Sequence, residues 1–169
     1  MEKPNKKGGK TIMPNIGIDD KNRDQVGKIL NRVLADEYVL YTKTRGYHWN
    51  VVGPQFNDLH KFFEAQYEEL SDIVDDVAER ARTIGVNSLG SLQEMVDHKT
   101  LEEDTTKGTD AKHMVRSLLS DHEAIVRKLR GDLEKAADKY KDIGTNDFLT
   151  GLMEKHEKMA WMLRSYLED

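Results

Sequence analysis

One stretch decides the fold: HWNVVGPQFNDLH, residues 48–60. Its centre is the pair Gly53-Pro54, which interrupts a helix because proline lacks the N–H that a helix needs and glycine leaves the backbone free. His48 therefore falls at the end of one helical pattern, and His60 falls one turn into the next. If the two helices fold back on each other, the two imidazoles meet across the turn.

Three carboxylates follow His60 along the second helix: Glu64, Asp75 and Glu79. On a wheel of ~100° per residue these four positions fall at roughly 0°, 40°, 60° and 100°, so they share one band. Imidazole nitrogens and carboxylate oxygens are ligands for iron, manganese and zinc. The hairpin therefore carries the ligand types of a metal centre.

The two halves of this ligand set are too far apart on one chain to hold a single ion. His60 and Asp75 are ~22 Å apart along a helix, whereas a metal–ligand bond is only ~2 Å long. Either Asp75 and Glu79 are ordinary surface acids, or a second copy of the chain brings them to His48 and His60. A two-fold axis across antiparallel copies would create two equivalent sites.

The apolar residues of the same helix favour the intersubunit interpretation. They are Leu59, Phe62, Phe63, Tyr67, Leu70, Ile73, Val74, Val77, Ala81 and Ile84. Their stripe is centred near ~270°, beside the acidic band rather than on it. The hairpin can bury this stripe in its own core and still offer the band to a neighbour.

The chain resembles the Dps family here, the DNA-binding proteins from starved cells, which are ferritin-like mini-cages. The shared signature is H-W-x-V-x-G, then five residues, L-H-x-x-x-E, and further on D-x-x-x-E. It matches at His48, Trp49, Val51, Gly53, Leu59, His60, Glu64, Asp75 and Glu79. The family often has Asp where this chain has Glu64. The resemblance extends from about Lys21 to Leu167.

The resemblance implies an all-α, ferritin-like four-helix bundle with a short extra helix in the loop between helices 2 and 3. It implies a dodecamer built from two-fold dimers. Such a particle oxidises ferrous iron with hydrogen peroxide or O2 at dimer-interface ferroxidase centres, stores the ferric mineral and protects DNA under oxidative stress. The implied metal is iron, up to two ions per intersubunit site, with zinc or manganese as substitutes. The implied metal ligands are His48, His60, Glu64, Asp75 and Glu79, and the implied catalytic set is His48, His60, Asp75, Glu79 and Trp49.

Composition agrees with one helical domain. The chain has 169 residues, 34% of them charged and 37% hydrophobic, with only three prolines. The absence of cysteine excludes disulfides, thiolate metal sites and cysteine nucleophiles. No apolar run is long enough to span a membrane and no secretory signal is visible, so we expect a cytoplasmic protein without a membrane partner.

Residues 1–17 read as a flexible basic tail in front of a bundle domain at residues 18–169. The net charge of −5 does not suggest a general nucleic-acid-binding surface. Lysines of the tail could nevertheless neutralise DNA phosphates without reading sequence, which would make the particle nucleoid-associated. The plainer interpretation is a solubilising tail. The candidate DNA contacts are Lys3, Lys6, Lys7 and Lys10.

Four long amphipathic segments account for the bundle. Asp19-Asp20 can cap the first, which ends at Trp49, and Gly85 ends the second. A short helix is expected within Ser91–His98. Thr109-Asp110 starts the third long helix, and Thr145-Asn146-Asp147 is expected to cap the fourth.

Glu37, His122 and His156 lie on apolar stripes of these helices. Glu37 could be a metal ligand, as in full-size ferritins. The sequence contains no Glu-x-x-His, the motif that di-iron bundles carry on two helices, which argues against a centre within one subunit. We therefore expect Glu37 to be a paired structural acid, and the two histidines to be core residues with satisfied polar atoms.

Four more residues have two interpretations each. Trp49 can anchor the hairpin end, or its indole can supply an electron near an oxidising metal. Asp138, Asp142 and Asp147 cluster around the connection between the third and fourth long helices. They can line an acidic three-fold pore that draws in Fe²⁺, as in ferritin-like cages, or merely solvate and cap helix ends.

Two other functions stay open at this stage. The chain could form a DNA-compacting particle with a vestigial metal site, or it could be a plain helical interaction module whose acids are a solvated face. Rapid oxidation of added Fe²⁺ would distinguish an iron oxidase from a DNA-compacting particle. A cage-sized particle would exclude a plain interaction module.

Overall fold

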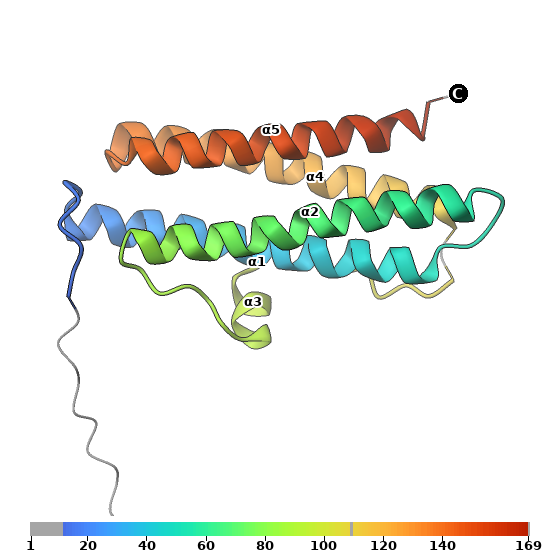
Figure 1. The fold of residues 1–169 in the computed structure, drawn as a ribbon, viewed down its shortest axis with the longest axis horizontal. Coiled ribbons are helices and arrows are strands. Elements are labelled where there is room, and N and C mark those ends of the chain that lie inside the picture. Colours follow the sequence, from blue (N-terminus) through green and yellow to red (C-terminus); the bar gives the residue numbers. More distant parts are fainter. Residues whose placement is uncertain (1–11, 109, 169) are drawn as a thin grey trace, which may run out of the picture.

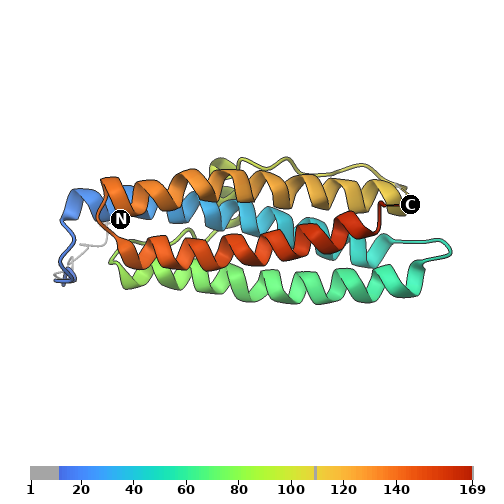
Figure 2. The same cartoon turned by 90° about the horizontal axis from the view of Figure 1, so that it is seen from above.

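The computed structural model describes residues 12–108 and 110–168, and these form helices and loops without a strand. The long helices are α1 (Asp20–Asn50), α2 (Phe56–Thr83), α4 (Ala111–Glu134) and α5 (Ile143–Ser165). Figure 1 shows α1 and α2 as one hairpin and α4 and α5 as a second, and Figure 2 shows the same bundle from above. The short helix α3 (Leu92–His98) lies in the connection between the hairpins. The predicted four-helix bundle with one extra short helix is therefore confirmed.

Three helices begin where the sequence predicts. Asp19 caps α1 by accepting a hydrogen bond from the backbone N–H of Asn22 at 2.8 Å. Ser91 and Glu94 form a capping box at α3. Asp110 caps α4 through the backbone N–H of His113 at 2.8 Å. Each cap satisfies a backbone donor that the first turn of a helix leaves without an internal partner.

The start of α5 differs from the prediction. The cap is Asp142, whose carboxylate accepts from the backbone N–H of Thr145 at 2.8 Å and from its hydroxyl at 2.6 Å. The predicted cap at Thr145–Asp147 is wrong because the chain reverses earlier. A π-helical turn η1 (Lys135–Lys139) follows α4 directly, and Lys141 then adopts a positive φ of 58°. Asp147 consequently lies inside the helix.

The breaker at residues 51–55 makes the tight turn between α1 and α2. Val51 is extended and ends α1. Gly53 has a φ of +114°, a conformation that other residues rarely adopt. The N–H of Phe56 then donates to the carbonyl of Gly53 at 3.0 Å and starts α2. This turn brings the end of α1 against the first turn of α2.

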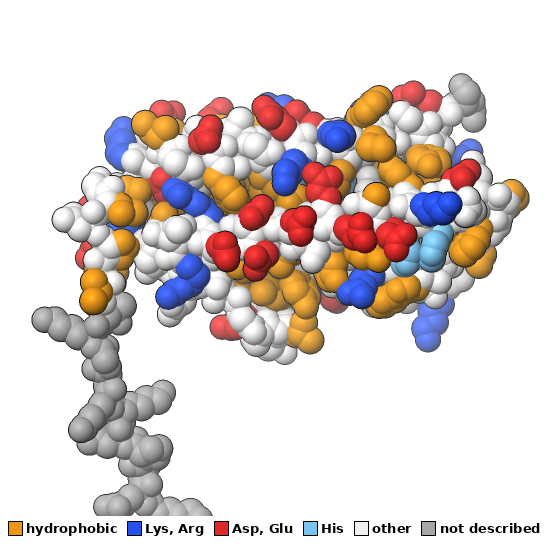
Figure 3. All heavy atoms as spheres, in the orientation of Figure 1, with side chains coloured by type: hydrophobic (Ala, Val, Ile, Leu, Met, Phe, Trp, Pro, Cys, Tyr) orange, Lys and Arg blue, Asp and Glu red, His pale blue; other side chains and the backbone are white. Residues whose placement is uncertain are grey.

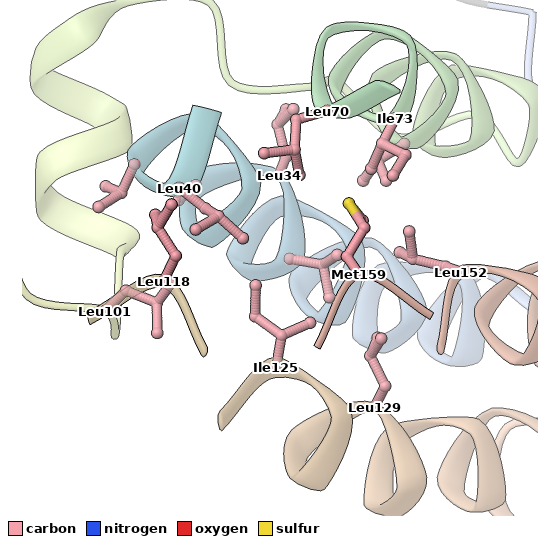
Figure 4. Close-up of a cluster of buried hydrophobic side chains, with 14 of the residues drawn as sticks. Leu34, Leu40, Leu70, Ile73, Leu101, Leu118, Ile125, Leu129, Leu152 and Met159 are labelled. Atoms are coloured by element: carbon pink, nitrogen blue, oxygen red, sulfur yellow. The ribbon is translucent and has the colours of Figure 1, made fainter. Parts of the chain in front are cut away.

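The apolar stripes of the four long helices meet along the bundle axis. Figure 4 shows Leu34 of α1, Leu70 and Ile73 of α2, Leu118, Ile125 and Leu129 of α4, and Leu152 and Met159 of α5 in one cluster. Each such side chain contributes about 1.5–3 kcal/mol when it is fully buried. Within the described part of the chain, no helix is long and apolar enough to cross a membrane.

Salt bridges set α1 and α4 antiparallel to each other. Lys43 of α1 lies 2.7 Å from Asp121 of α4, and Arg32 pairs with Asp132 further along. The α1 residue number falls as the α4 number rises. The two hairpins are thereby held in one register, which fixes the side chains of α1 relative to both neighbours.

Candidate metal centre at the α1–α2 turn

His48 and His60 are joined by a reciprocal pair of hydrogen bonds across the turn, which we call the histidine clasp. The His48 Nδ1–H donates to the carbonyl oxygen of His60 at 2.8 Å, and the His60 Nδ1–H donates to the carbonyl oxygen of His48 at 2.9 Å. The two rings stack with centroids 3.8 Å apart. The prediction that the turn brings the imidazoles together is confirmed.

The clasp also decides which nitrogen of each ring can bind a metal. A carbonyl oxygen can only accept a hydrogen bond, so both Nδ1 atoms carry the proton. In the neutral ring this leaves the lone pair on Nε2 of each histidine. Backbone carbonyls that hold the Nδ1–H of a metal-binding histidine fix its orientation in this way. Two neighbouring Nε2 donors are thus prepared at one end of the bundle.

The carboxylates of the predicted set divide into two groups. Glu64 follows His60 by one turn of α2 and is half-buried. Asp75 and Glu79 are exposed on the far half of the same uninterrupted helix, and ~22 Å of helix separates His60 from Asp75. Figure 3 shows acidic side chains following one another along this helix toward the histidines. Within residues 12–108 and 110–168, no three histidine, aspartate or glutamate side chains converge as they would around an ion.

One of the distant acids, Asp75, lines an open groove between α1, α2 and α3. Its volume is about 470 Å³, and Asp72 and Asp75 lie on its rim with Ser71 and Tyr38. Its apolar lining is Leu34, Val74, Ala78, Leu89 and Met95. Leu92 and Val96 of α3 are also exposed, at 69% and 45%. Asp72 and Asp75 are therefore presented on a partly apolar surface, a composition that suits contact with another protein chain.

Arg45 and Tyr67 surround the clasp, and the sequence analysis missed both as site residues. The Tyr67 ring lies edge-on to His48 at 5.2 Å, and its hydroxyl lies 3.5 Å from Glu64 Oε1. The Arg45 guanidinium lies over the rings of Trp49 and Tyr67 at 5.3 and 5.5 Å. A sequence signal existed: Arg45 precedes His48 by three residues, and Tyr67 follows Glu64 by three, so each shares a helix face with its ligand neighbour.

Trp49 is 65% exposed beside the clasp. Arg45 holds its ring from one side, and the rest of the indole faces away from the core of this single chain. Trp49 therefore lies outside the buried core, and its role as an anchor of the hairpin end stays a prediction. A role in electron donation, or in contact with a second copy, stays a prediction.

A second polar cluster lies inside the bundle and is completely buried. His156 Nε2 lies 2.9 Å from Glu37 Oε1, an ion-pair contact without hydrogen-bond alignment. On its other side, His156 Nδ1 and His122 Nδ1 share a hydrogen bond of 2.9 Å. The three side chains come from α1, α5 and α4. They form a row rather than a shell around one point, so Glu37 is a paired acid of the core. Both histidines are core residues as predicted, but the expectation that their polar atoms are satisfied is wrong: neither Nε2 has a hydrogen-bond partner among the described residues.

The three acids of the candidate pore differ in exposure. Asp138 and Asp147 are exposed. Asp142 is buried, and Arg80 Nη2 donates to its Oδ1 at 3.0 Å in addition to the cap bonds from Thr145. Its oxygens are occupied in holding the start of α5, so an acidic pore would depend on Asp138 and Asp147. The candidate DNA contacts Lys3, Lys6, Lys7 and Lys10 lie outside the described residues.

Comparison with known proteins identifies similar chains. The family model of the ferritin-like domain matches residues 27–169. A low temperature-induced protein of Nostoc sp. is 47% identical over 154 residues, covering 91% of this chain and 86% of its own. DNA protection during starvation protein 2 of Bacillus anthracis is 36% identical over 143 residues, covering 85% and 97%.

Solved structures agree in fold. The Dps crystal structure from Bacillus brevis has a TM-score of 0.84 at 35% identity and covers 89% of this chain and 100% of its own. The Vibrio cholerae O1 protein has a TM-score of 0.87 at 29% identity, covering 95% and 100%. That protein is described as a member of a superfamily of ferritin-like diiron-carboxylate proteins.

Proposed function

The chain belongs to the Dps family of ferritin-like proteins, and from that membership we propose that it is a protective, iron-oxidising and iron-storing protein. Ferrous iron is its substrate and hydrogen peroxide the preferred oxidant. The centre is shared between two copies of the chain. His48, His60 and Glu64 come from one copy, and Asp75 and Glu79 come from the other.

The observation that carries this proposal is the histidine clasp. Its two Nδ1–H bonds to carbonyl oxygens leave two Nε2 donors side by side. The acids that would complete the ligand set lie ~22 Å further along the same helix. Both facts are explained if an antiparallel copy supplies the missing acids, since a two-fold interface places residue i of one copy against residue j of the other.

The donor set suits the chemistry. Neutral imidazoles and carboxylates bind Fe²⁺, and hard anionic carboxylate oxygens stabilise Fe³⁺ after oxidation. Few protein ligands leave open positions on the metal where peroxide can bind. The protein itself supplies no nucleophile; it binds the iron, orients it and holds the charge that develops. When two ferrous ions together give two electrons to one peroxide, no hydroxyl radical is released.

Protection of DNA follows from this chemistry without direct contact. Removal of ferrous iron together with peroxide removes the two reactants that generate hydroxyl radical. Relatives of the chain are named DNA protection during starvation proteins, which supports this role. The proposed particle is a dodecameric cage in the cytoplasm, which iron enters past Asp138 and Asp147. Direct DNA contact through the lysines of residues 1–17 stays a prediction.

The test removes the Nε2 donors while keeping the turn. In the double variant His48→Asn with His60→Asn, the amide nitrogen takes the place of Nδ1 and can still donate to the opposite carbonyl, but no Nε2 remains. Stopped-flow absorbance after addition of Fe²⁺ and peroxide should show loss of the rapid oxidation phase, while light scattering shows the wild-type particle size. His98→Asn, at an exposed histidine of α3, is the matched control. Unchanged oxidation in the double variant would refute the proposal.

A further inference from the structure

Three tyrosines lie in a row on the α1–α2 face that carries the histidine clasp. The Tyr67 ring is 5.2 Å from His48, the Tyr41 ring is 6.3 Å from Tyr67, and the Tyr38 ring is 6.1 Å from Tyr41. We call Tyr67, Tyr41 and Tyr38 the tyrosine row. Its neighbouring rings are close enough for single electrons to pass between them.

The far end of the row reaches the acidic half of the ligand set. Tyr38 borders the same groove as Asp72 and Asp75. In the proposed dimer, Asp75 serves the site whose histidines belong to the other copy. One chain therefore extends an unbroken series of oxidisable rings from the histidines of one iron site to the acids of the second.

We infer that the tyrosine row carries single electrons between the two iron sites of a dimer, so that one peroxide can take its two electrons from ferrous ions bound at different sites. This inference rests on the proposed function and deepens it. This electron transfer matters most when iron is scarce. A site that holds one ferrous ion has only one electron to give, and half-reduced peroxide is hydroxyl radical.

The steps balance in atoms and electrons. The first ferrous ion gives one electron to peroxide, which with one proton yields water and a hydroxyl-radical equivalent. Tyr67 gives the second electron together with its phenolic proton, which produces a second water and a tyrosyl radical. The ferrous ion of the other site then reduces this radical through Tyr41 and Tyr38, and a proton from solvent restores the phenol. The sum is one peroxide, two ferrous ions and two protons converted to two ferric ions and two waters.

The surroundings of Tyr67 favour this coupled loss of an electron and a proton. The Tyr67 hydroxyl lies 3.5 Å from Glu64 Oε1, a carboxylate oxygen placed to accept the phenolic proton. The Arg45 guanidinium, 5.5 Å from the Tyr67 ring and 5.8 Å from the Tyr41 ring, disfavours a positively charged radical. Tyr67 and Tyr41 are therefore expected to lose a proton when they lose an electron.

The test uses substitutions that keep each ring and remove only the phenol oxygen: Tyr67→Phe, Tyr41→Phe and Tyr38→Phe. Metal-free assembled protein is loaded anaerobically with one ferrous ion per site and mixed with one peroxide per two ferrous ions. A ferrous chelator then measures the iron left unoxidised, and spin-trap EPR measures hydroxyl radical. Tyr140→Phe is the control, because Tyr140 lies between η1 and α5, away from the turn between α1 and α2.

Wild-type protein and the control should oxidise both ferrous ions with little trapped radical. Each variant of the row should leave about one ferrous ion in two, by the stoichiometry above. Tyr67→Phe should also trap several times more hydroxyl radical, whereas Tyr41→Phe and Tyr38→Phe, which keep Tyr67, should instead show a tyrosyl radical that lasts longer than in wild type. Freeze-quenched EPR should also show a tyrosyl signal in wild-type protein that disappears in Tyr67→Phe, which a purely structural role would not produce. If all three variants match wild type, the inference is wrong while rapid oxidation dependent on His48 and His60 still stands. If wild-type protein leaves the iron ferrous, the proposed function itself fails.

Discussion

His122 is a histidine with no exposed surface, and its only polar contact among the described residues is another histidine. Burial, and then the positive charge of His156, hold the pKa of His122 well below its ordinary value of 6.5. Below pH 6.5 the unfolded chain therefore binds a proton at His122, whereas the folded chain does not. The free energy of unfolding consequently decreases as the pH falls below 6.5, and this loss is absent above the unfolded pKa.

A non-titrating substitution should weaken this acid sensitivity. Between pH 6.5 and about pH 5 the lost free energy of unfolding is at most about 2 kcal/mol, since one pKa unit is worth about 1.4 kcal/mol. Urea midpoints across this range should fall less steeply for His122→Gln than for wild-type protein. His98→Gln, at an exposed histidine, should keep the wild-type slope. Parallel curves for wild type and His122→Gln would contradict the assignment.

The start of α5 depends on Asp142, one of the three acids that the sequence analysis considered for a pore. Asp142 accepts from the backbone and hydroxyl of Thr145 and from Arg80 of α2, so one carboxylate starts α5 and ties it to the other hairpin. An N-cap contributes about 1 kcal/mol, and breaking a buried charge pair leaves Arg80 without its partner.

Replacement of Asp142 should reduce the free energy of unfolding much more than replacement of Asp147. Asp142→Ala should lower the free energy of unfolding by about 2–4 kcal/mol, because it removes both the cap and the pair. Asp147→Ala, at an exposed position inside the helix, should change it by less than about 0.5 kcal/mol. Urea unfolding followed by far-UV circular dichroism measures both variants. Equal losses in the two variants would contradict the assignment of Asp142 as the N-cap of α5.

This pair shows what helical periodicity can and cannot predict. Amphipathic spacing located all four long helices and the short one, because burial of a stripe depends only on the sequence of each helix. It could not choose between Asp142 and Asp147, since both precede apolar residues. The choice depends on η1 and on the reversal at Lys141, which tertiary packing imposes.

The candidate site likewise contains residues that the sequence predicted and residues that it missed. The meeting of His48 and His60 followed from one breaker between two helices, which is a local property. The surrounding Arg45 and Tyr67 were missed because tyrosine and arginine at helical spacing are ordinary partners of a core stripe. Only the ring distances show that they gather around the histidines.

At the scale of the whole molecule, the proposed ligand set is complete only if each of two copies supplies half of the ligands of every site. This can be tested by mixing two inactive chains. One carries His48→Asn and His60→Asn, and the other carries Asp75→Asn and Glu79→Gln. Each should fail alone, since each lacks one half of every site.

Coexpression of the two chains should restore rapid iron oxidation. A mixed dimer contains one intact site and one doubly damaged site. With random pairing about half of the dimers are mixed, so roughly a quarter of the wild-type sites should return. Stopped-flow amplitude per subunit measures this recovery. If no activity returns in particles of normal size, the site does not draw its ligands from two chains.

The histidine clasp has a consequence for how the protein can change over time. The groups that orient the two rings are carbonyl oxygens of the main chain, and a carbonyl is present whatever side chain a codon specifies. No single substitution can delete them; it can only shift the backbone that positions them. Substitutions at neighbouring positions can therefore change how the two rings are oriented, while Nε2 stays the nitrogen available to a metal wherever the two carbonyls keep their places.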